Sequence, residues 1–153
     1  MGFRSYTARN SNRRRKFRFE TRISDGGGDF AIGIGFASTL PEIGTGLPQE
    51  MDSNTMGLCM NSGNLCHGKN YTKAFDKNSC SDGDVVTCHL QRGKVHDINY
   101  SVCQFFRNGV SVGIQSVPET KLYPCVWVAS GNVVVETNLG DQEFVYNKGI
   151  ITL

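Results

Sequence analysis

Apolar and polar residues alternate most regularly over residues 102–113, which read VCQFFRNGVSVG. In the middle, Asn108-Gly109 suits the left-handed backbone that both central positions of a type I′ turn require. The flanking runs therefore predict a β-hairpin, and its two-residue turn fixes a register with Phe105 opposite Val112. Because side chains alternate across a strand, one face of this hairpin is predicted to be core, and it carries Cys103, Phe105, Val110, Val112 and Ile114.

The N-terminal third shows two more strand-like runs. Residues 17–23 alternate apolar and charged side chains, which is typical of a half-buried strand. Residues 30–38 are mostly apolar but contain Gly33 and Gly35. Glycine inside a strand weakens it unless another group packs closely against the backbone there, so we expect such a close approach.

Glycine turns predict further strand pairs in the rest of the chain. Runs 122–129 and 132–140 meet at Ser130-Gly131, and we expect them to form a second hairpin. Residues 91–99 read as a charged loop, and 38–54 as a long surface loop of the kind that carries recognition. The other predicted strands are 55–60 paired with 64–67 across Ser62-Gly63, then 85–90, and a short one at 144–146.

No segment has the apolar spacing of an amphipathic helix. Some eight to ten short strands with irregular loops are typical of an antiparallel β-sandwich. The pattern therefore predicts an all-β fold.

Length and charge narrow the class of protein further. The 153 residues suit one domain, which would bury roughly two-thirds of the surface that its unfolded chain exposes. A net charge of +2 and the lack of a long apolar run indicate that neither nucleic acid nor a membrane is an obligatory partner. Most of the six cysteines lie within strand-like runs. That favours buried thiols in a reducing compartment, the cytoplasm or the nucleus, over a disulfide scaffold.

No group of residues in the sequence predicts catalysis. Cys66-His67 and Cys88-His89 look like metal-ligand pairs, but neighbours in a strand point to opposite faces, so neither pair can chelate through both side chains. A cysteine nucleophile needs an adjacent base, and nothing in the spacing brings an imidazole to a thiol. The aspartates stand in predicted turns, where they shape the backbone. We expect a protein that is not an enzyme and has no cofactor or metal.

Seven segments occur in an order that resembles the SPRY domain. They are FRFETRI, IGIGFA, a glycine-containing hairpin ending in CHGKN, GDVV, FFRNGVSVG, LYPCVWV and VVVETNLG. The likeness is strongest to the SPRY domains of Ran-binding scaffold proteins of ubiquitin-ligase complexes, because LYP, a glycine turn, VVxxNxG and FVY follow one another. The resemblance covers residues 17–146, leaving a basic polar segment at 1–16 and a tail or edge strand at 147–153.

This resemblance implies a bent antiparallel sandwich of two sheets without catalytic activity. It implies a monomeric domain that binds a protein or peptide through loops at one end, as a substrate-recognition or scaffold unit of a ubiquitin-ligase-type complex. Three segments would form the binding surface: the end of the second strand, the hairpin before the GKN segment, and the turn after the LYP strand. They contribute Asp29, then Leu65, Cys66, His67 and Asn70, then Ser130, Gly131 and Asn132.

The chain departs from the family's pattern within this surface. The family often has an aromatic residue in place of Cys66 and, in its peptide binders, a tryptophan in place of Ser130, so a different class of peptide is expected. A small residue is usual where Trp127 stands. Trp127 alternates with two valines that should face the core, which predicts an indole on the outer face. There it would contact a partner, unless a terminal strand or the 38–54 loop covers it.

Two other functions fit parts of the sequence. The basic stretch 13–18 would suit nucleic-acid binding, with Phe17 available for base stacking. The alternation of residues 17–23 argues against it, because it places Phe17 on the inner face of its strand. A lectin-like sandwich would share the architecture but would need clustered Asp and Asn beside exposed aromatic residues.

Overall fold

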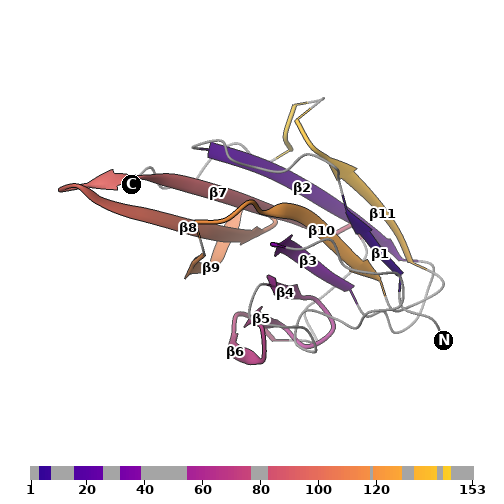
Figure 1. Cartoon of the computed structure of the whole chain (residues 1–153). Coiled ribbons are helices and arrows are strands. Elements are labelled where there is room, and N and C mark those ends of the chain that lie inside the picture. Colours follow the sequence, from indigo (N-terminus) through magenta and orange to yellow (C-terminus); the bar gives the residue numbers. More distant parts are fainter. Residues whose placement is uncertain are drawn as a thin grey trace.

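The chain folds into two antiparallel β-sheets (Figure 1). They contain eleven strands, formed by the residues that the computed structural model describes: 4–7, 16–25, 32–38, 55–76, 83–117, 119–128, 133–140 and 143–145. Within these ranges no helix has the length and hydropathy needed to cross a membrane. The all-β sandwich predicted from the sequence is confirmed.

The first sheet has six strands. Its order is β1 (Arg4–Thr7), β10 (Tyr123–Val128), β3 (Ile32–Ala37), β4 (Thr55–Cys59), β5 (Asn64–His67) and β6 (Asn70–Lys73). Two of its neighbouring pairs, β1 with β10 and β10 with β3, join strands that are distant in sequence. The predicted β4–β5 pairing is confirmed, with Leu58 opposite Leu65. Residues 4–7 supply a strand ahead of the FRFETRI segment, on the edge of this sheet.

The second sheet has five strands. Its order is β11 (Val133–Asn138), β2 (Lys16–Asp25), β7 (Val85–Val95), β8 (Ile98–Arg107) and β9 (Val110–Ser116). The predicted hairpin of 122–129 with 132–140 is wrong, because β10 pairs with β1 and β3 whereas β11 pairs with β2. Both segments are strands, but the chain changes sheets between them. Apolar runs separated by a glycine turn are common to a hairpin and to such a crossing, so sequence pattern does not separate the two.

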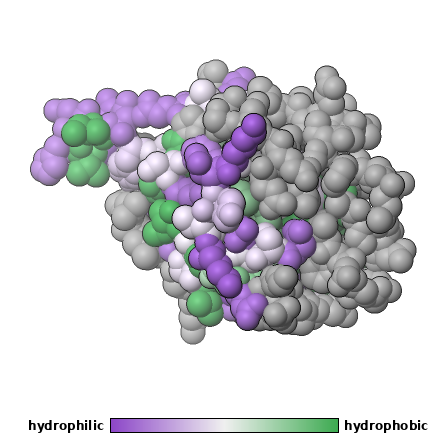
Figure 2. All heavy atoms as spheres, turned by 90° about the horizontal axis from the view of Figure 1, so that it is seen from below, coloured by the Kyte–Doolittle hydropathy of each residue, from purple (hydrophilic) through white to green (hydrophobic). Residues whose placement is uncertain are grey.

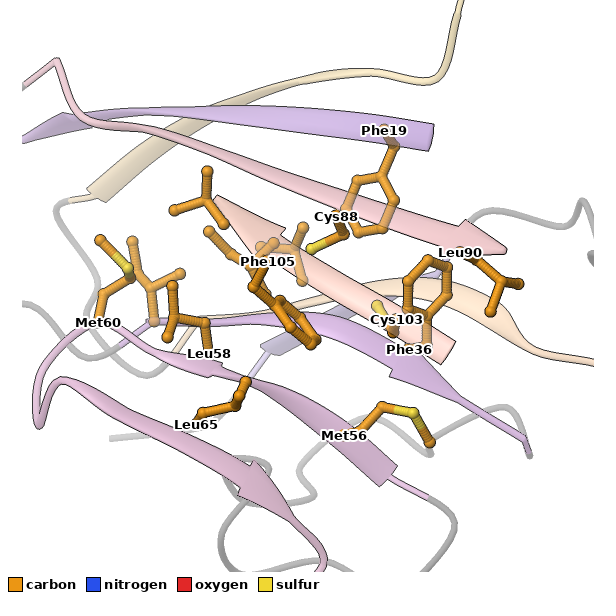
Figure 3. Close-up of a cluster of buried hydrophobic side chains, with 14 of the residues drawn as sticks. Phe19, Phe36, Met56, Leu58, Met60, Leu65, Cys88, Leu90, Cys103 and Phe105 are labelled. Carbon is orange, nitrogen blue, oxygen red and sulfur yellow. The ribbon is translucent and has the colours of Figure 1, made fainter. Parts of the chain in front are cut away.

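The core lies between the two sheets and is built from the inward side chains of both (Figure 3). Phe19 of β2 meets Phe36 of β3 edge-on, with ring centroids 5.3 Å apart. Cys88 and Phe105 enter from the second sheet, and Leu58 enters from the first. The inward phase predicted for residues 17–23 and for Cys103 and Phe105 is therefore confirmed.

The β8–β9 hairpin turns as predicted, but its register differs. Asn108 and Gly109 have φ angles of 50° and 81°, as a type I′ turn requires. A β-bulge after Phe105 then places Gly113, not Val112, opposite Phe105. Leu65 of the other sheet fills the space above this glycine, since a Cβ there would lie 2.5 Å from Leu65 Cδ2. Beyond the bulge Ile114 lies opposite Gln104 on the outer face and is exposed, and Val110, beside the turn and opposite Arg107, is exposed as well.

Residues 91–99 form paired strands rather than the predicted charged loop. The β7–β8 ladder runs on to Val95 opposite Ile98, closed by a turn in which both His96 and Asp97 have positive φ. Tyr100 covers Gly93 across the ladder, which supports the ribbon beyond the rest of the sheet. The ribbon projects at the left of Figures 1 and 2, and its tip exposes Val95 and Ile98. The tip of this ribbon is exposed on both faces, so its sequence does not alternate between apolar and polar residues. Without that alternation the strands could not be predicted.

The predicted short strand at 144–146 is not present at the two of its residues that the structure describes. Phe144 and Val145 instead lie against the outer face of β2. The Val145 amide donates a hydrogen bond to Glu20 Oε1 at 2.9 Å, and the Arg18 guanidinium stacks 4.4 Å from the centre of the Phe144 ring. The Phe144 ring thus covers part of a polar strand, whereas Val145 contributes its backbone amide and its side chain is 54% exposed.

Candidate functional site

The predicted binding surface falls partly within the described residues. Asp29 and the turn of Ser130, Gly131 and Asn132 lie outside them. Leu65, Cys66, His67, Asn70 and Trp127 are described, on β5, on β6 and on β10. The structure brings the first four together in one hairpin, and Trp127 lies on a strand three places away in the same sheet.

Two residues of the hairpin are structural. Leu65 belongs to the core cluster and packs over Gly113. Cys66 is fully buried, and its sulfur lies 3.3 Å from that of Cys59, close enough for one thiol to donate to the other. This hydrogen bond lowers the pKa of the Cys66 thiol, although burial acts in the opposite direction. Neither side chain is exposed to meet a partner, so we remove both from the candidate surface.

The other two residues do reach the surface. His67 and Asn70 are directly opposite each other at the closed end of the β5–β6 hairpin. Gly68, with a φ of 58°, makes the tight turn between them. His67 is half-buried and Asn70 is exposed. Both can therefore offer hydrogen-bonding groups to a partner in a backbone frame that is already set.

The most exposed aromatic side chain of this hairpin is not among the predicted site residues. Tyr71 is 66% exposed, and it lies opposite the buried Cys66 in the ladder. Its strand, β6, is the edge of the six-stranded sheet, and all four of its side chains are exposed. A lone tyrosine in the polar stretch 68–81 was the available signal, but its exposure depends on β6 being an edge strand, which pattern does not show.

We call the group His67, Lys69, Asn70 and Tyr71 the hairpin surface; it wraps the sheet edge, because His67 and Asn70 lie on one face and Tyr71, opposite Cys66, lies on the other. It combines an aromatic ring, an imidazole, an amide and an ammonium group, with Lys73 adding a second positive charge on the same strand. Tyrosine is among the side chains enriched at binding hot spots because it offers a large rigid contact area and a polar tip. No described group of three or more His, Cys, Asp or Glu side chains is placed to hold a metal ion.

The Trp127 indole is covered in the structure, which is the alternative that its sequence pattern left open. Its phase was predicted correctly, because Val126 and Val128 belong to the core cluster and Trp127 does not. The indole is nevertheless only 1% exposed, and its Nε1 has no hydrogen-bond partner. A residue that leaves the core side of a sheet is not thereby exposed to solvent, since other parts of the chain can bury the outer face.

His89 also lies on an outer face that is buried. The Cys88 thiol points into the core, where burial raises its pKa well above the usual value. The neighbouring His89 imidazole is on the opposite face, as strand alternation predicted. Its pKa is lowered by burial first and then by the positive charges of Arg18 and Lys16. A cationic neighbourhood favours the neutral imidazole but opposes binding of a metal cation.

Nucleic-acid binding through the basic stretch would need Phe17 to be available for base stacking. Phe17 is half-buried and packs against the core, with its ring 6.3 Å from that of Phe36, so it is not available to stack on a base. The Arg18 guanidinium is stacked on Phe144. Residues 13–15 of the basic stretch lie outside the described residues.

The arrangement of the strands is similar to that of a solved domain. The crystal structure of the SPRY domain of human HERC1 matches with a TM-score of 0.62 and 19% sequence identity, over 94% of this chain and 86% of the HERC1 chain. No family model and no curated protein sequence matches the chain. A likeness at this level of identity establishes the fold and leaves the subfamily open. The chain therefore has the fold of the SPRY domain, which the order of its strand motifs predicted.

Proposed function

We propose that this chain is a non-catalytic interaction domain that binds a protein or peptide through the hairpin surface. The observation that carries the proposal is the edge strand β6, which exposes Tyr71 on one face of the sheet and Asn70, opposite His67, on the other. The SPRY resemblance supports it, because the family's peptide site includes the positions of His67 and Asn70. Asp29 and residues 130–132 complete the proposed surface by the same resemblance.

The geometry supports binding without a large conformational change. The Gly68 turn and the β5–β6 ladder already hold His67, Asn70 and Tyr71 in fixed backbone positions, so little entropy is lost when a partner binds. Truncating a central interface tyrosine typically costs about 2 kcal/mol or more of binding free energy. Lys69 and Lys73 favour a partner that carries acidic residues near the contact.

A finer part of the proposal concerns the cellular role. The likeness of the strand motifs to Ran-binding scaffold proteins supports a substrate-recognition or scaffold role in a ubiquitin-ligase-type complex, with this chain as a monomeric domain. We place it in a reducing compartment, the cytoplasm or the nucleus. The five described cysteines support this, because all are buried free thiols.

The experiment is capture of partners from a cell lysate, with identification by mass spectrometry. We compare the wild-type chain with Tyr71→Ala and with the matched control Val110→Ala, which removes an equally exposed apolar side chain from the other sheet. Proteins captured by the wild type and by the control but lost with Tyr71→Ala support the proposal. If the folded Tyr71→Ala variant captures the same proteins in the same amounts, the hairpin surface is not the binding site.

A further inference from the structure

A cavity of about 360 Å³ lies on the outer side of the five-stranded sheet, away from the hairpin surface. It is lined by β2, by β11 and by the segment that follows β11. The volume is roughly twelve times the share of one water molecule in the liquid, so the space is large enough for a side chain of another molecule. Its lining includes the carboxylates Glu20, Glu136 and Glu143 and one cation, Arg22.

The chain builds this cavity with specific contacts. After β11, the amide of Gly140 donates to Asn138 Oδ1 at 2.9 Å, and Gly140 has a φ of 109° that turns the chain back. Asn138 Nδ2 donates to the Glu143 carbonyl at 3.3 Å, and the Val145 amide donates to Glu20 Oε1. The wall formed by residues 143–145 is therefore fixed to both strands beneath it.

The three carboxylates that line the cavity form no ion pairs with the described cations. Glu20 is 5% exposed, and its second oxygen, Oε2, has no hydrogen-bond partner. Glu136 stands opposite Arg22 in the β2–β11 ladder, but no ion pair joins them, and the Glu143 carboxylate contacts no described cation. Three carboxylates against one arginine leave a negative cavity with a buried oxygen that can still accept hydrogen bonds.

A purely structural role for Glu20 explains only half of the observation. One oxygen holds the Val145 amide, and burial lowers the pKa of the Arg18 guanidinium, although the nearby Glu20 charge acts in the opposite direction. A structural clamp needs a single acceptor, and a glutamine would provide it. A structural role does not explain why Glu20 Oε2 has no partner, or why two further carboxylates and an open volume lie beside it.

We propose that this acidic cavity binds the guanidinium of an arginine side chain from an extended peptide. A guanidinium presents a planar fork of donors that matches a carboxylate, whereas an ammonium does so only as a point charge. A carboxylate accepts hydrogen bonds at both of its oxygens, so a guanidinium can donate to Oε2 while Oε1 keeps the Val145 amide. In the described sheet no strand pairs with the outer edge of β11, which leaves backbone groups beside the cavity for an extended chain.

The test is a titration of the ¹⁵N-labelled chain followed by NMR, with three probes. These are the capped peptide Gly-Gly-Arg-Gly-Gly and its versions with lysine or citrulline at the centre. Citrulline keeps the shape of arginine but has no charge. We expect saturable shifts at the amides of Glu20, Glu136 and Val145 with the arginine peptide, weaker binding of the lysine peptide, and no binding of the citrulline peptide. Absence of saturable shifts, or equal binding of the citrulline peptide, overturns the proposal.

Variants assign the binding to the cavity. Glu20→Gln keeps an acceptor for Val145 but removes the charge, and we expect it to weaken arginine-peptide binding by about tenfold or more. The control is Glu119→Gln, an exposed carboxylate outside the cavity, which should bind as the wild type does. If Glu20→Gln does not fold, Glu136→Gln takes its place. Unchanged affinity in the folded cavity variant removes the site, and Tyr71→Ala should leave this binding intact, because the two surfaces are independent.

Discussion

The outer faces of the two sheets are each buried in part, and the buried parts are built from different chemistry. On the six-stranded sheet, glycines of β3 and β4 lie between Trp127 and Cys125 on one side and Cys59 and Cys66 on the other. On the five-stranded sheet the corresponding face carries Arg18, Glu20, Thr87, His89 and Gln104. The first face is apolar or weakly polar, and the second consists mostly of hydrogen-bonding and charged groups.

The two sheets differ in how the residues of their outer faces are buried. Small residues and thiols allow close approach and cost little to bury, because they leave few polar atoms without partners. A polar face needs partners for its groups, and some of its atoms do not have them, such as Glu20 Oε2 and Thr87 Oγ1. Unmet polar atoms reduce stability, so the polar face is the one that binding or mutation can improve.

The largest effect is expected from Trp127→Ala on the apolar face. Removing an indole that is 1% exposed should lower the free energy of unfolding by about 3–5 kcal/mol. Urea denaturation followed by circular dichroism measures this, with the exposed Val134→Ala as the control, which should stay within about 0.5 kcal/mol of wild type. A small loss for Trp127→Ala would mean that the indole is not packed and that this face is open.

A smaller loss is expected at Gly35. A Cβ at this position would overlap the backbone of β4 at Met56 and Gly57, which cannot move without breaking the ladder. Gly35→Ala should therefore cost about 3 kcal/mol, and Gly113→Ala only about 1 kcal/mol, because a Cβ there meets the movable end of Leu65. The same denaturation experiment compares them, and equal costs would contradict the close approach at Gly35.

On the polar face, a substitution at Thr87 should increase stability rather than decrease it. This residue is 1% exposed and its hydroxyl has no hydrogen-bond partner, so Thr87→Val should raise the free energy of unfolding by about 1 kcal/mol. The matched control is Thr137→Val, which removes a hydroxyl that lies 3.1 Å from the Thr21 hydroxyl and should therefore destabilise. Destabilisation by both variants would show that Thr87 has a partner after all.

The smallest effect is expected from pH, through His89. Because the pKa of this imidazole is lowered in the folded chain, chiefly by burial, the unfolded chain takes up a proton first as the pH falls below about 6.5. Stability should decrease from there until the folded-state pKa is reached, and then this contribution levels off. Denaturation midpoints at pH 7.5, 6.5 and 5.5 test it. His89→Gln should reduce the decrease, whereas His96→Asn, in the exposed turn, should not.

Local features of the fold could be predicted from the sequence, and long-range features could not. Alternation in 17–23 and the Asn108-Gly109 turn were sufficient for β2 and for the β8–β9 hairpin, because period and turn chemistry are local. The predicted Phe105 register was wrong because a β-bulge shifts the pairing by one residue, which the turn length alone does not reveal. The pairing of β10 with β11 was wrong because the partner of a strand is a long-range choice.

The candidate site shows the same division. His67 and Asn70 follow from motif position, and both lie at the surface. Cys66 and Trp127 do not contact solvent, since burial of an outer face depends on what crosses it. Neither the exposure of Tyr71 nor the acidic cavity could be predicted from the sequence, where these residues are single polar or aromatic positions without a motif. Glu20, Glu136 and Glu143 are far apart in sequence and meet only because β11 pairs with β2 and the chain then turns back.

By itself the sequence determined that the chain would form short antiparallel strands, which side chains of β2 would enter the core, and that Asn108-Gly109 would make a tight turn. These follow from backbone sterics and side-chain alternation, which act over a few residues. Only the tertiary structure decided which strands pair, which outer faces are covered and which carboxylates share a cavity. Those outcomes depend on contacts between distant segments, and many different pairings satisfy the same local pattern equally well.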